Sequence, residues 1–559
     1  MTVRVFLLAA LALVLATPAS TQECAPARAE AYLEGADVRA LLFNNGALFW
    51  KGGDHVYEVP KGSGRQSIFS AAFWLSGTVD GEPRFSGSDY GPYEYWPGPL
   101  LEDGGAPSPD SCAEHDRIWS VTLADVAAYN ATGETTDDLR EWPAHLGAPV
   151  VDGDGDPTNY DLAAGDRPNV YGGHVLWWIM NDLGGTHEWG DLPGLGVEVR
   201  VSASAASEGL AGQFEPGTPI ADLVRTATHY RFEILHRGTE TVEDVHVGLY
   251  VDADLGFFSD DYVGTDSTSR MVYAYNGDDF DEGSAGYGDR PPAVGIVADR
   301  PPEGVTTRGS YMSKNGGGTI IGAFRANEAA NALRGFVRDG SYRWTFGEDG
   351  TNPNRPITNW TFPALPPDYW SMARIDSLGT RFPPSDKRMM IAQGPYTLAP
   401  GDGFTFEIAI PWARADGGGA LGSVRELVTF LGPAASALPM APPADLATIL
   451  PTDSRVGTGT EPTPPRGDPR AFALAPIPWP NPVRDRLVLR YDAPSTAPVR
   501  LAIYDALGRE VSVALDGPAT LGYNRLEVDA SRFAPGLYTY RLVADGEPLR
   551  TVGRFVVVR

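Results

Sequence analysis

Frequent glycine and proline residues divide this sequence into short segments of strand-like composition. The chain has 65 glycines and 48 prolines among 559 residues, so long uninterrupted elements are rare. Strand composition, or alternation of apolar and polar side chains, marks residues 47–50, 68–75, 197–201, 230–235 and 404–410. We therefore predict a mainly β protein, with a β-sandwich-rich ectodomain, long ordered loops and few short helices.

Helical segments are few and short. The candidates are residues 123–129, 136–142, 327–334 and 423–431. Thr135 or Thr136 is suited to cap the second of these helices, and Pro143 is suited to end it. No period of about 20 to 50 residues repeats along the chain, which argues against a propeller or a solenoid.

A stretch rich in proline and glycine divides the chain into two parts. The glycines and prolines of this stretch interrupt any helical or strand periodicity; they are Gly457, Gly459, Pro462, Pro464, Pro465, Gly467 and Pro469. This composition is typical of an extended linker. We predict a β-rich secreted ectodomain over residues 21–456, with room for two sub-domains, a linker over 457–475 and a separate domain over 476–559.

The last part of the chain, residues 476–559, has the pattern of a small β-sandwich. Apolar side chains recur at every second position at Leu487, Leu489, Tyr491, Val499, Leu501 and Ile503. Gly508 stands in a turn, at the point where a positive φ is needed. About seven strands in about 80 residues fit an immunoglobulin-like sandwich.

Several motifs of this C-terminal part are similar to those of a known family. They are Pro480-Asn481-Pro482, residues 499–511 with Gly508, residues 535–542 with Gly536 and Tyr538, and residues 554–559. These motifs resemble the type A C-terminal sorting domain of the type IX secretion system. The resemblance implies recognition by the translocon of that system and transport to the cell surface or the medium. It also implies removal of the domain and attachment of the cargo to surface lipopolysaccharide.

The ectodomain also contains familiar segments. Residues 116–119, 165–168, 177–182, 251–256, 260–266, 275–278 and 288–295 resemble parts of large secreted Bacteroidota proteins that carry the same C-terminal domain. This resemblance covers most of the chain and supports a shared fold. It implies no particular activity.

The first residues have the layout of a secretory signal peptide. Arg4 precedes an apolar run over residues 5–15, and the small residues of 17–20 follow. The run is too short to span a bilayer, and no later run approaches the ~18 apolar residues of a transmembrane helix. We predict a signal peptide over residues 1–20, passage through the periplasm, and no transmembrane segment in the mature chain.

The negative charge of the chain excludes two classes of partner. The formal net charge is −28 and the isoelectric point is about 4.6. Nucleic acids and anionic membrane surfaces are both polyanions, so they repel such a protein. We therefore expect neither as a partner.

The chain has two cysteines, Cys24 and Cys112. In an oxidising periplasm, such a pair most often forms one disulfide. Residues 21–23 lack the small and apolar side chains of a lipobox, which argues against a lipid anchor on Cys24. We predict a Cys24–Cys112 bridge.

A first acidic cluster contains Asp152, Asp154, Asp156 and Asp161. Alternate carboxylates on a glycine-rich loop can converge on Ca²⁺, which takes about six to eight oxygen ligands. The pattern is not an EF-hand, because Pro157 stands at the glycine position and Ala163 at that of the bidentate glutamate. We predict a structural calcium site; the alternative is a solvated acidic loop.

A second acidic cluster contains Asp252, Asp254, Asp260 and Asp261. In a strand, Asp252 and Asp254 point to the same face, where their like charges repel unless a cation or an arginine neutralises them. The cluster is a second calcium candidate. The alternative is again an exposed acidic loop.

Aromatic side chains are dense in two regions, around Trp50, Trp74 and residues 90–96, and around Trp177, Trp178 and Trp189. Exposed rings of this kind stack on sugars or partner proteins. The alternative is that they cover the edge of a β core. Trp177 and Trp178 adjoin apolar residues, so at least one of them is predicted to be buried.

No sequence motif in the chain indicates catalysis. The sequence has no G-x-S-x-G elbow, no H-E-x-x-H, no P-loop and no dinucleotide fingerprint. His174, His187 and Glu188 match no zinc spacing. We favour a non-catalytic surface protein that acts in adhesion, matrix or glycan contact. The alternative is a secreted hydrolase acting on polysaccharide or protein, which needs only two carboxylates at a set separation.

Overall fold

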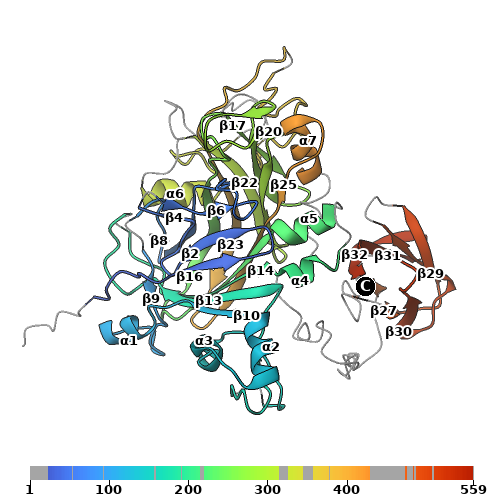
Figure 1. Ribbon diagram of the computed structural model, residues 1–559, viewed down its shortest axis with the longest axis horizontal. Coiled ribbons are helices and arrows are strands. Elements are labelled where there is room, and N and C mark those ends of the chain that lie inside the picture. The colour runs from blue at the N-terminus through green and yellow to red at the C-terminus, as the bar shows by residue number, and fades with distance from the viewer. Residues whose placement is uncertain are drawn as a thin grey trace, which may run out of the picture.

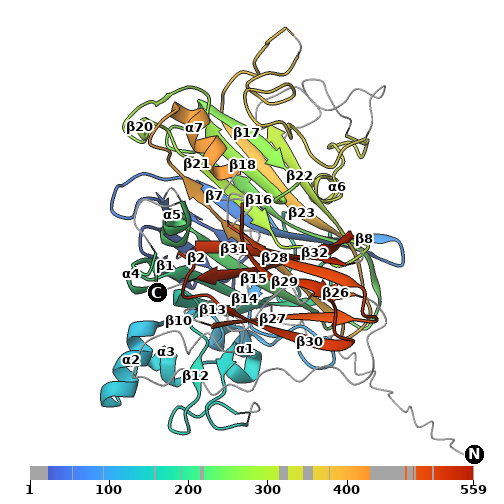
Figure 2. The same ribbon diagram turned by 90° about the vertical axis from the view of Figure 1, so that its right-hand side faces the viewer.

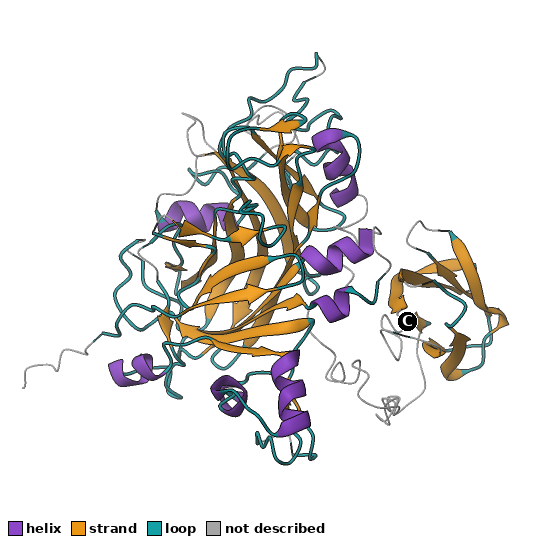
Figure 3. Ribbon diagram, in the orientation of Figure 1, coloured by secondary structure: helices purple, strands orange, loops and turns teal. Residues whose placement is uncertain are grey.

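Strands are the predominant secondary structure, and the helices lie at the periphery (Figures 1 and 3). The computed structural model describes residues 23–52, 54–91, 94–156, 159–189, 192–214, 219–313, 325–343, 357–376, 378–428, 472–474, 483, 486–505, 509–534, 536–544 and 546–557. The predicted signal peptide lies outside these ranges, as does the linker except for residues 472–474. The prediction of a mainly β fold is confirmed.

The ectodomain is built on two large antiparallel sheets. The first has nine strands: β1 (Glu30–Glu34), β2 (Arg39–Phe43), β3 (Ala47–Leu48), β7 (Ser70–Val79), β16 (Val242–Asp252), β23 (Lys387–Leu398) and β22 (Thr306–Ser313) in that order, with β6 (Tyr57–Glu58) on β2 and β8 (Glu82–Ser86) on β7. The central β16 contributes an eleven-residue run paired on both sides.

The second sheet has ten strands. They are β10 (Trp119–Thr122), β13 (Gly173–Asn181), β14 (Val197–Ala206), β15 (Thr228–His236), β24 (Gly403–Ile410), β21 (Ala293–Ala298), β18 (Met271–Asn276) and β17 (Asp261–Asp266) in order, with β9 (Trp96–Pro97) on β13 and β25 (Trp412–Ala413) on β21. The described residues of the ectodomain also form three two-stranded pairs outside the large sheets: β4 (Trp50–Lys51) with β5 (Asp54–His55), β11 (Val150–Val151) with β12 (Arg167–Pro168), which we call the β11–β12 hairpin, and β19 (Phe280–Asp281) with β20 (Gly288–Asp289).

One hydrophobic core lies between the two sheets. It takes Phe73 and Leu249 from the first sheet, and Trp178 and Phe232 from the second. The rings of Phe73 and Phe232 stack across the interface with their centroids 4.6 Å apart. Because each sheet contributes the inward-facing half of its side chains, the ectodomain is a β-sandwich.

Parts of the outer faces are covered as well. Helix α6 (Ala326–Leu333) packs on the outer face of the first sheet against Trp74 and Tyr250. Helices α2 (Leu123–Thr132) and α3 (Asp137–Arg140), with the 3-10 turn η1 (Ala144–Leu146), form a lobe on the outer face at β10 and β13 (Figure 1, cyan). As a result, Trp177 is buried under the lobe while Trp178 is buried in the central core, which explains why β13 has no polar face.

The predicted helices match observed ones. Residues 123–129, 136–142 and 327–334 correspond to α2, α3 and α6, and Thr136 caps α3 by accepting from the Leu139 amide at 3.1 Å. Helix α7 (Gly419–Glu426) begins four residues before the predicted position 423. The other helices in the described part of the chain are α1 (Pro109–Glu114), α4 (Glu208–Ala211) and α5 (Pro219–Thr226). Among the described residues, none of the helices has the length and apolarity to cross a membrane.

The predicted disulfide is present. Cys24 and Cys112, which are 88 positions apart in the chain, are bonded to each other and buried beside Trp96. The bond ties the described N-terminal end of the ectodomain to α1.

The C-terminal domain is a small sandwich with sheets of its own, drawn apart from the ectodomain in Figure 1 and in front of it in Figure 2 (red). One sheet contains β26 (Ala473–Leu474), β27 (Arg486–Ala493) and β30 (Gly522–Asp529); the other contains β29 (Glu510–Pro518), β28 (Pro498–Tyr504), β31 (Gly536–Ala544) and β32 (Glu547–Val557). Its hydrophobic core includes the predicted alternating residues Leu487, Leu489, Tyr491, Val499, Leu501 and Ile503.

Two of the predicted sorting-motif residues lie in β31. Gly536 begins the strand, and the Tyr538 ring stacks on Phe555 at 5.4 Å while its hydroxyl donates to the Ala534 carbonyl at 2.9 Å. Pro480, Asn481, Pro482 and Gly508 lie outside the described residues.

Candidate functional site

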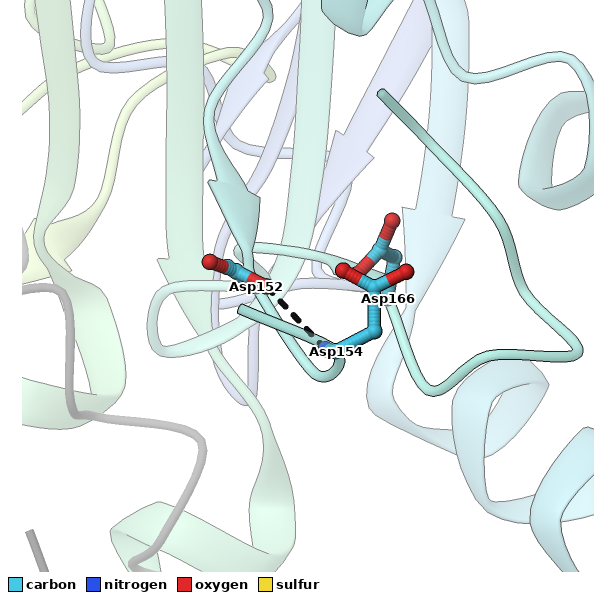
Figure 4. A group of neighbouring side chains, drawn as sticks. All are labelled: Asp152, Asp154 and Asp166. Carbon is cyan, nitrogen blue, oxygen red and sulfur yellow. Dashed lines mark hydrogen bonds between the residues drawn. The ribbon is translucent and has the colours of Figure 1, made fainter. Parts of the chain in front are cut away.

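The first acidic cluster lies at the end of the β11–β12 hairpin. Strand pairing places Val151 opposite Arg167, so Asp152 and Asp166 face each other where the hairpin opens. Carboxylate oxygens of Asp152, Asp154 and Asp166 all lie within 4.8 Å of one another. Figure 4 shows Asp154 and Asp166 side by side, with the Asp154 amide bonded to Asp152.

Asp166 organises this acidic loop. It is 1% exposed, and its two oxygens accept from the Gly153 amide at 2.9 Å and the Asp161 amide at 2.7 Å. Asp152 accepts from the Gly155 amide at 2.6 Å. The buried carboxylate therefore holds both ends of the loop, while Asp152 and Asp154 remain exposed.

The structure changes the membership of this predicted group. Asp156 and Asp161 are not among the three carboxylates that converge; Asp161 instead accepts from the Ala163 amide at 2.8 Å. Asp166, which lies outside the alternating pattern of the sequence, takes their place. It follows the alternating aspartates by ten residues, and only the hairpin pairing brings it back to them. Three carboxylates supply an all-oxygen donor set of the kind that a hard divalent cation binds.

The second acidic cluster is divided by the fold. Asp252, at the end of β16, and Asp254 converge with Asp386, which precedes β23, with oxygens within 4.8 Å of one another. Asp260 and Asp261 are not part of this group. The chain thus places the predicted residues in two neighbouring environments.

Arg388 lies in the first of these environments. Its Nη1 atom lies 2.6 Å from Asp252 Oδ1, and the guanidinium is also paired with Asp386. Burial lowers the pKa of Arg388, but the attraction of Asp252 and the other nearby acidic groups raises it by a larger amount, so the net shift of the pKa is upward. The Tyr90 hydroxyl donates to the other oxygen of Asp252. An arginine therefore neutralises the repulsion expected between these carboxylates.

Asp260 and Asp261 lie at the start of β17 beside Asp281 and Glu282. Asp261 is 1% exposed and accepts from the Leu255 amide at 2.9 Å, while Asp260 accepts from the Asn276 side chain at 2.8 Å. Burial, together with the neighbouring Asp260 and Asp254 carboxylates, raises the pKa of Asp261 well above its usual value. Burial and the Glu282 carboxyl raise the pKa of Asp260 to about 7. Proton uptake or a cation would relieve this concentration of buried charge.

Some of the predicted aromatic residues stay accessible. Trp74, Tyr95 and Trp96 are buried, as the alternative reading of the sequence predicted. Trp50 and Tyr90 are half-buried, and their ring centroids are 5.7 Å apart. Phe69 contacts both rings at 6.2 Å. We call Trp50, Phe69 and Tyr90 the aromatic group; it is anchored by the bond from Tyr90 to buried Asp252.

The histidines considered as metal ligands have separate partners. His174 accepts from the Glu34 amide at 3.0 Å and contacts Ser120 Oγ at 2.9 Å. His187 lies 3.2 Å from the buried Glu94 carboxylate. Burial lowers the pKa of His187, but the Glu94 and Asp182 interactions raise it more, and the net shift is upward.

The C-terminal sandwich, with its own core and an export motif of the predicted type, has the features of a secretion signal domain. Residues 478–558 match the family model described as a secretion system C-terminal sorting domain. This confirms the predicted type IX sorting domain. The protein is therefore handled by that secretion machinery and exported to the cell surface or the medium.

No curated protein matches the chain. Among solved structures, partial likeness is found to a polysaccharide lyase (10% identity, 64% of this chain and 34% of that chain, TM-score 0.15). A second is the adhesin domain of Epf from Streptococcus pyogenes (8% identity, 60% of this chain and 80% of that chain, TM-score 0.13). A third is dimeric latent PorU from Porphyromonas gingivalis (11% identity, 69% of this chain and 31% of that chain, TM-score 0.15). The chain spans only about a third of the lyase's length. TM-scores this low support no inference about the fold or the role of the present protein.

Proposed function

We propose that the ectodomain is a non-catalytic surface protein that acts by adhesion, through contact with glycan or matrix. The observation that carries this proposal is the aromatic group. Its three rings are half-buried and held together by ring contacts, and Tyr90 is fixed by its bond to Asp252. Rigid aromatic rings that keep part of their surface exposed supply contact area at low entropic cost.

The burial of the charged residues beneath the aromatic group favours binding over catalysis. Asp252 and Arg388 have side chains that are 1% and 2% exposed. A carboxylate that acts as an acid, base or nucleophile must reach the substrate. Asp252 is instead engaged by Arg388 and covered by Tyr90, so its role in this proposal is to position the ring.

One observation favours the alternative, a secreted hydrolase. Burial raises the pKa of Asp89, which accepts from the Trp189 indole at 3.1 Å and lies near Arg388. In glycosidases, the general acid and its partner are two carboxyl groups whose surroundings shift their pKa values apart. Asp89, with its raised pKa, and Asp252, which is paired with Arg388, differ in this way.

We further propose that calcium has a structural role in the ectodomain. The convergence of Asp152, Asp154 and Asp166 supports a site at the β11–β12 hairpin. Of the ligands predicted in the second cluster, Asp252 and Asp254 lie where Arg388 already supplies one positive charge. Asp260 and Asp261 lie apart from them, beside Asp281 and Glu282. The hairpin is therefore the stronger candidate. Removal of the sorting domain and attachment of the ectodomain to lipopolysaccharide are proposed on the family resemblance alone.

The function is tested with full-length secreted protein on a glycan array, beside a polysaccharide and protein hydrolysis screen. We expect glycan binding that Trp50→Ala weakens about tenfold, because one aromatic contact is lost. Tyr32→Ala is the matched control, since Tyr32 is an exposed ring, 40% accessible, outside the aromatic group. Turnover of a polysaccharide that Asp89→Asn abolishes would instead establish the hydrolase.

A further inference from the structure

The lobe on the outer face of the second sheet contains a cavity of about 360 Å³. It is lined by Glu141, Trp142, His145, Asn159 and Tyr160. Small-molecule sites in proteins typically measure roughly 300–1,000 Å³ and combine aromatic walls with a few polar groups. None of these five residues belongs to the aromatic group or to the converging carboxylates.

Two aromatic residues form a rigid wall of this cavity. The Trp142 indole N–H donates to the Pro149 carbonyl at 3.0 Å, and the Tyr160 hydroxyl donates to the Leu139 carbonyl at 2.6 Å. Trp142 is also packed into the core beneath the lobe. Trp142 is 2% exposed and supports the wall from behind, whereas Tyr160 is half-buried with its hydroxyl bonded to backbone, so its ring carbons are the main apolar surface open to a ligand. The wall is thus apolar and already ordered before any ligand arrives.

Polar side chains from two chain segments complete the lining. The Glu141 carboxylate is held by Arg117 Nη1 at 3.0 Å, and the Asn159 amide donates to Asp154 at 3.4 Å. His145 is exposed on η1. A carboxylate, an amide and an imidazole can each bond to a hydroxyl group. Asp166 accepts from the Asp161 amide, next in the chain to Tyr160, and so helps to hold this segment in place.

The charge around the cavity favours a neutral ligand. Among the lining residues that the structure describes, Glu141 is the one acidic side chain, and it is paired with Arg117 and lies 3.7 Å from Arg140. A cationic ligand would have to compete with two arginines for this carboxylate. Apolar ring carbons beside several hydroxyl-bonding groups match a pyranose, which has C–H faces and a rim of hydroxyls.

We propose that this cavity binds a neutral pyranose unit of a glycan. The inference rests on the proposed function, because it identifies one place where the ectodomain recognises a glycan and the class of unit that it takes. It adds a pocket-type contact to the aromatic group, on a different part of the ectodomain. Two separate contacts to one polymer would strengthen binding by effective concentration.

The test measures binding of full-length secreted protein to arrayed glycans, with free glucose, galactose, mannose and N-acetylglucosamine as competitors and choline as a cationic probe. Glu141→Ala and His145→Ala should each weaken binding of the best glycan about tenfold, the loss expected for one hydrogen bond of a charged or polar pair. The matched control is Glu134→Ala, which removes an exposed glutamate of the same lobe outside the cavity. Thermal melting of each variant shows that it is folded.

The outcomes separate this inference from the proposed function. Glycan binding that Glu141→Ala and His145→Ala weaken, and Glu134→Ala does not, supports the cavity. Binding that neither cavity variant changes, or that the control weakens equally, overturns the cavity and leaves glycan contact standing. Binding of choline that competes with the glycan overturns the neutral ligand. If the wild-type protein binds no glycan at all, the proposed function fails, and this inference fails with it.

Discussion

Arg388 Nη1 lies 2.6 Å from Asp252 Oδ1, and neither side chain is more than 2% exposed. The pair joins the end of β16 to the start of β23, two neighbouring strands of the nine-stranded sheet. It also fixes the position of Tyr90, which donates to the same carboxylate. A buried ion pair thus connects the packing of the sheet to the aromatic group beside the end of β16.

Arg388→Met should destabilise the ectodomain strongly, because it leaves the Asp252 carboxylate buried without its cation. Breaking such a pair typically costs about 3–5 kcal/mol. Chemical denaturation of the full chain, followed by tryptophan fluorescence, measures the loss. Arg290→Met, at an exposed pair with Asp416, is the control and should cost no more than about 1 kcal/mol. The double variant Asp252→Asn/Arg388→Met should recover part of the loss; equal costs at the two arginines would contradict the assignment.

The pair of His187 and Glu94 should make stability depend on pH. The pKa of His187 is raised in the folded protein, so the folded state binds its proton more tightly than the unfolded state does. Its contribution is therefore complete below the unfolded pKa of about 6.5 and is lost as the pH rises through the higher folded pKa. We expect the stability advantage of wild type over His187→Gln to shrink from pH 5.5 to pH 8.5. An advantage that stays constant across this pH range would refute the pairing.

Calcium should raise the melting temperature if the hairpin carboxylates bind it. At about 100 times the dissociation constant, a ligand specific for the folded state adds about 2.7 kcal/mol. Differential scanning calorimetry with and without millimolar Ca²⁺, after chelation, measures the shift. Asp152→Asn and Asp154→Asn should each reduce it, whereas Glu102→Gln, at an exposed site outside the loop, should not. An unchanged melting temperature for the wild type would exclude a site of useful affinity.

Deletion of residues 476–559 should leave the protein in the periplasm. The sorting domain is the part that the secretion machinery recognises, and it has its own hydrophobic core, so its loss should not unfold the ectodomain. Cell fractionation and surface labelling of the truncated and full-length proteins measure the distribution. Normal surface display of the truncated protein would show that export depends on another signal.

The sequence alone determined the features that rest on local patterns. Alternation at Leu487, Leu489 and Tyr491 indicated the strand now seen as β27, and the cap at Thr136 indicated the start of α3. The single pair of cysteines indicated the Cys24–Cys112 bridge. These signals are local in sequence or have one possible solution, so they do not depend on how distant segments pack.

Only the tertiary structure decided the features that depend on strand pairing and layer packing. Two adjacent residues, Trp177 and Trp178, are both buried because one outer face of the sheet is covered by the lobe, and no sequence period reports such a cover. Asp166 joins Asp152 only through the register of β11 and β12, and Arg388 meets Asp252 only because β23 pairs with β16. The side chains that make the candidate sites come from positions that the fold brings together over long sequence distances. The sequence therefore determined the export route and the β-rich class, whereas packing selected which acidic and aromatic residues form a site.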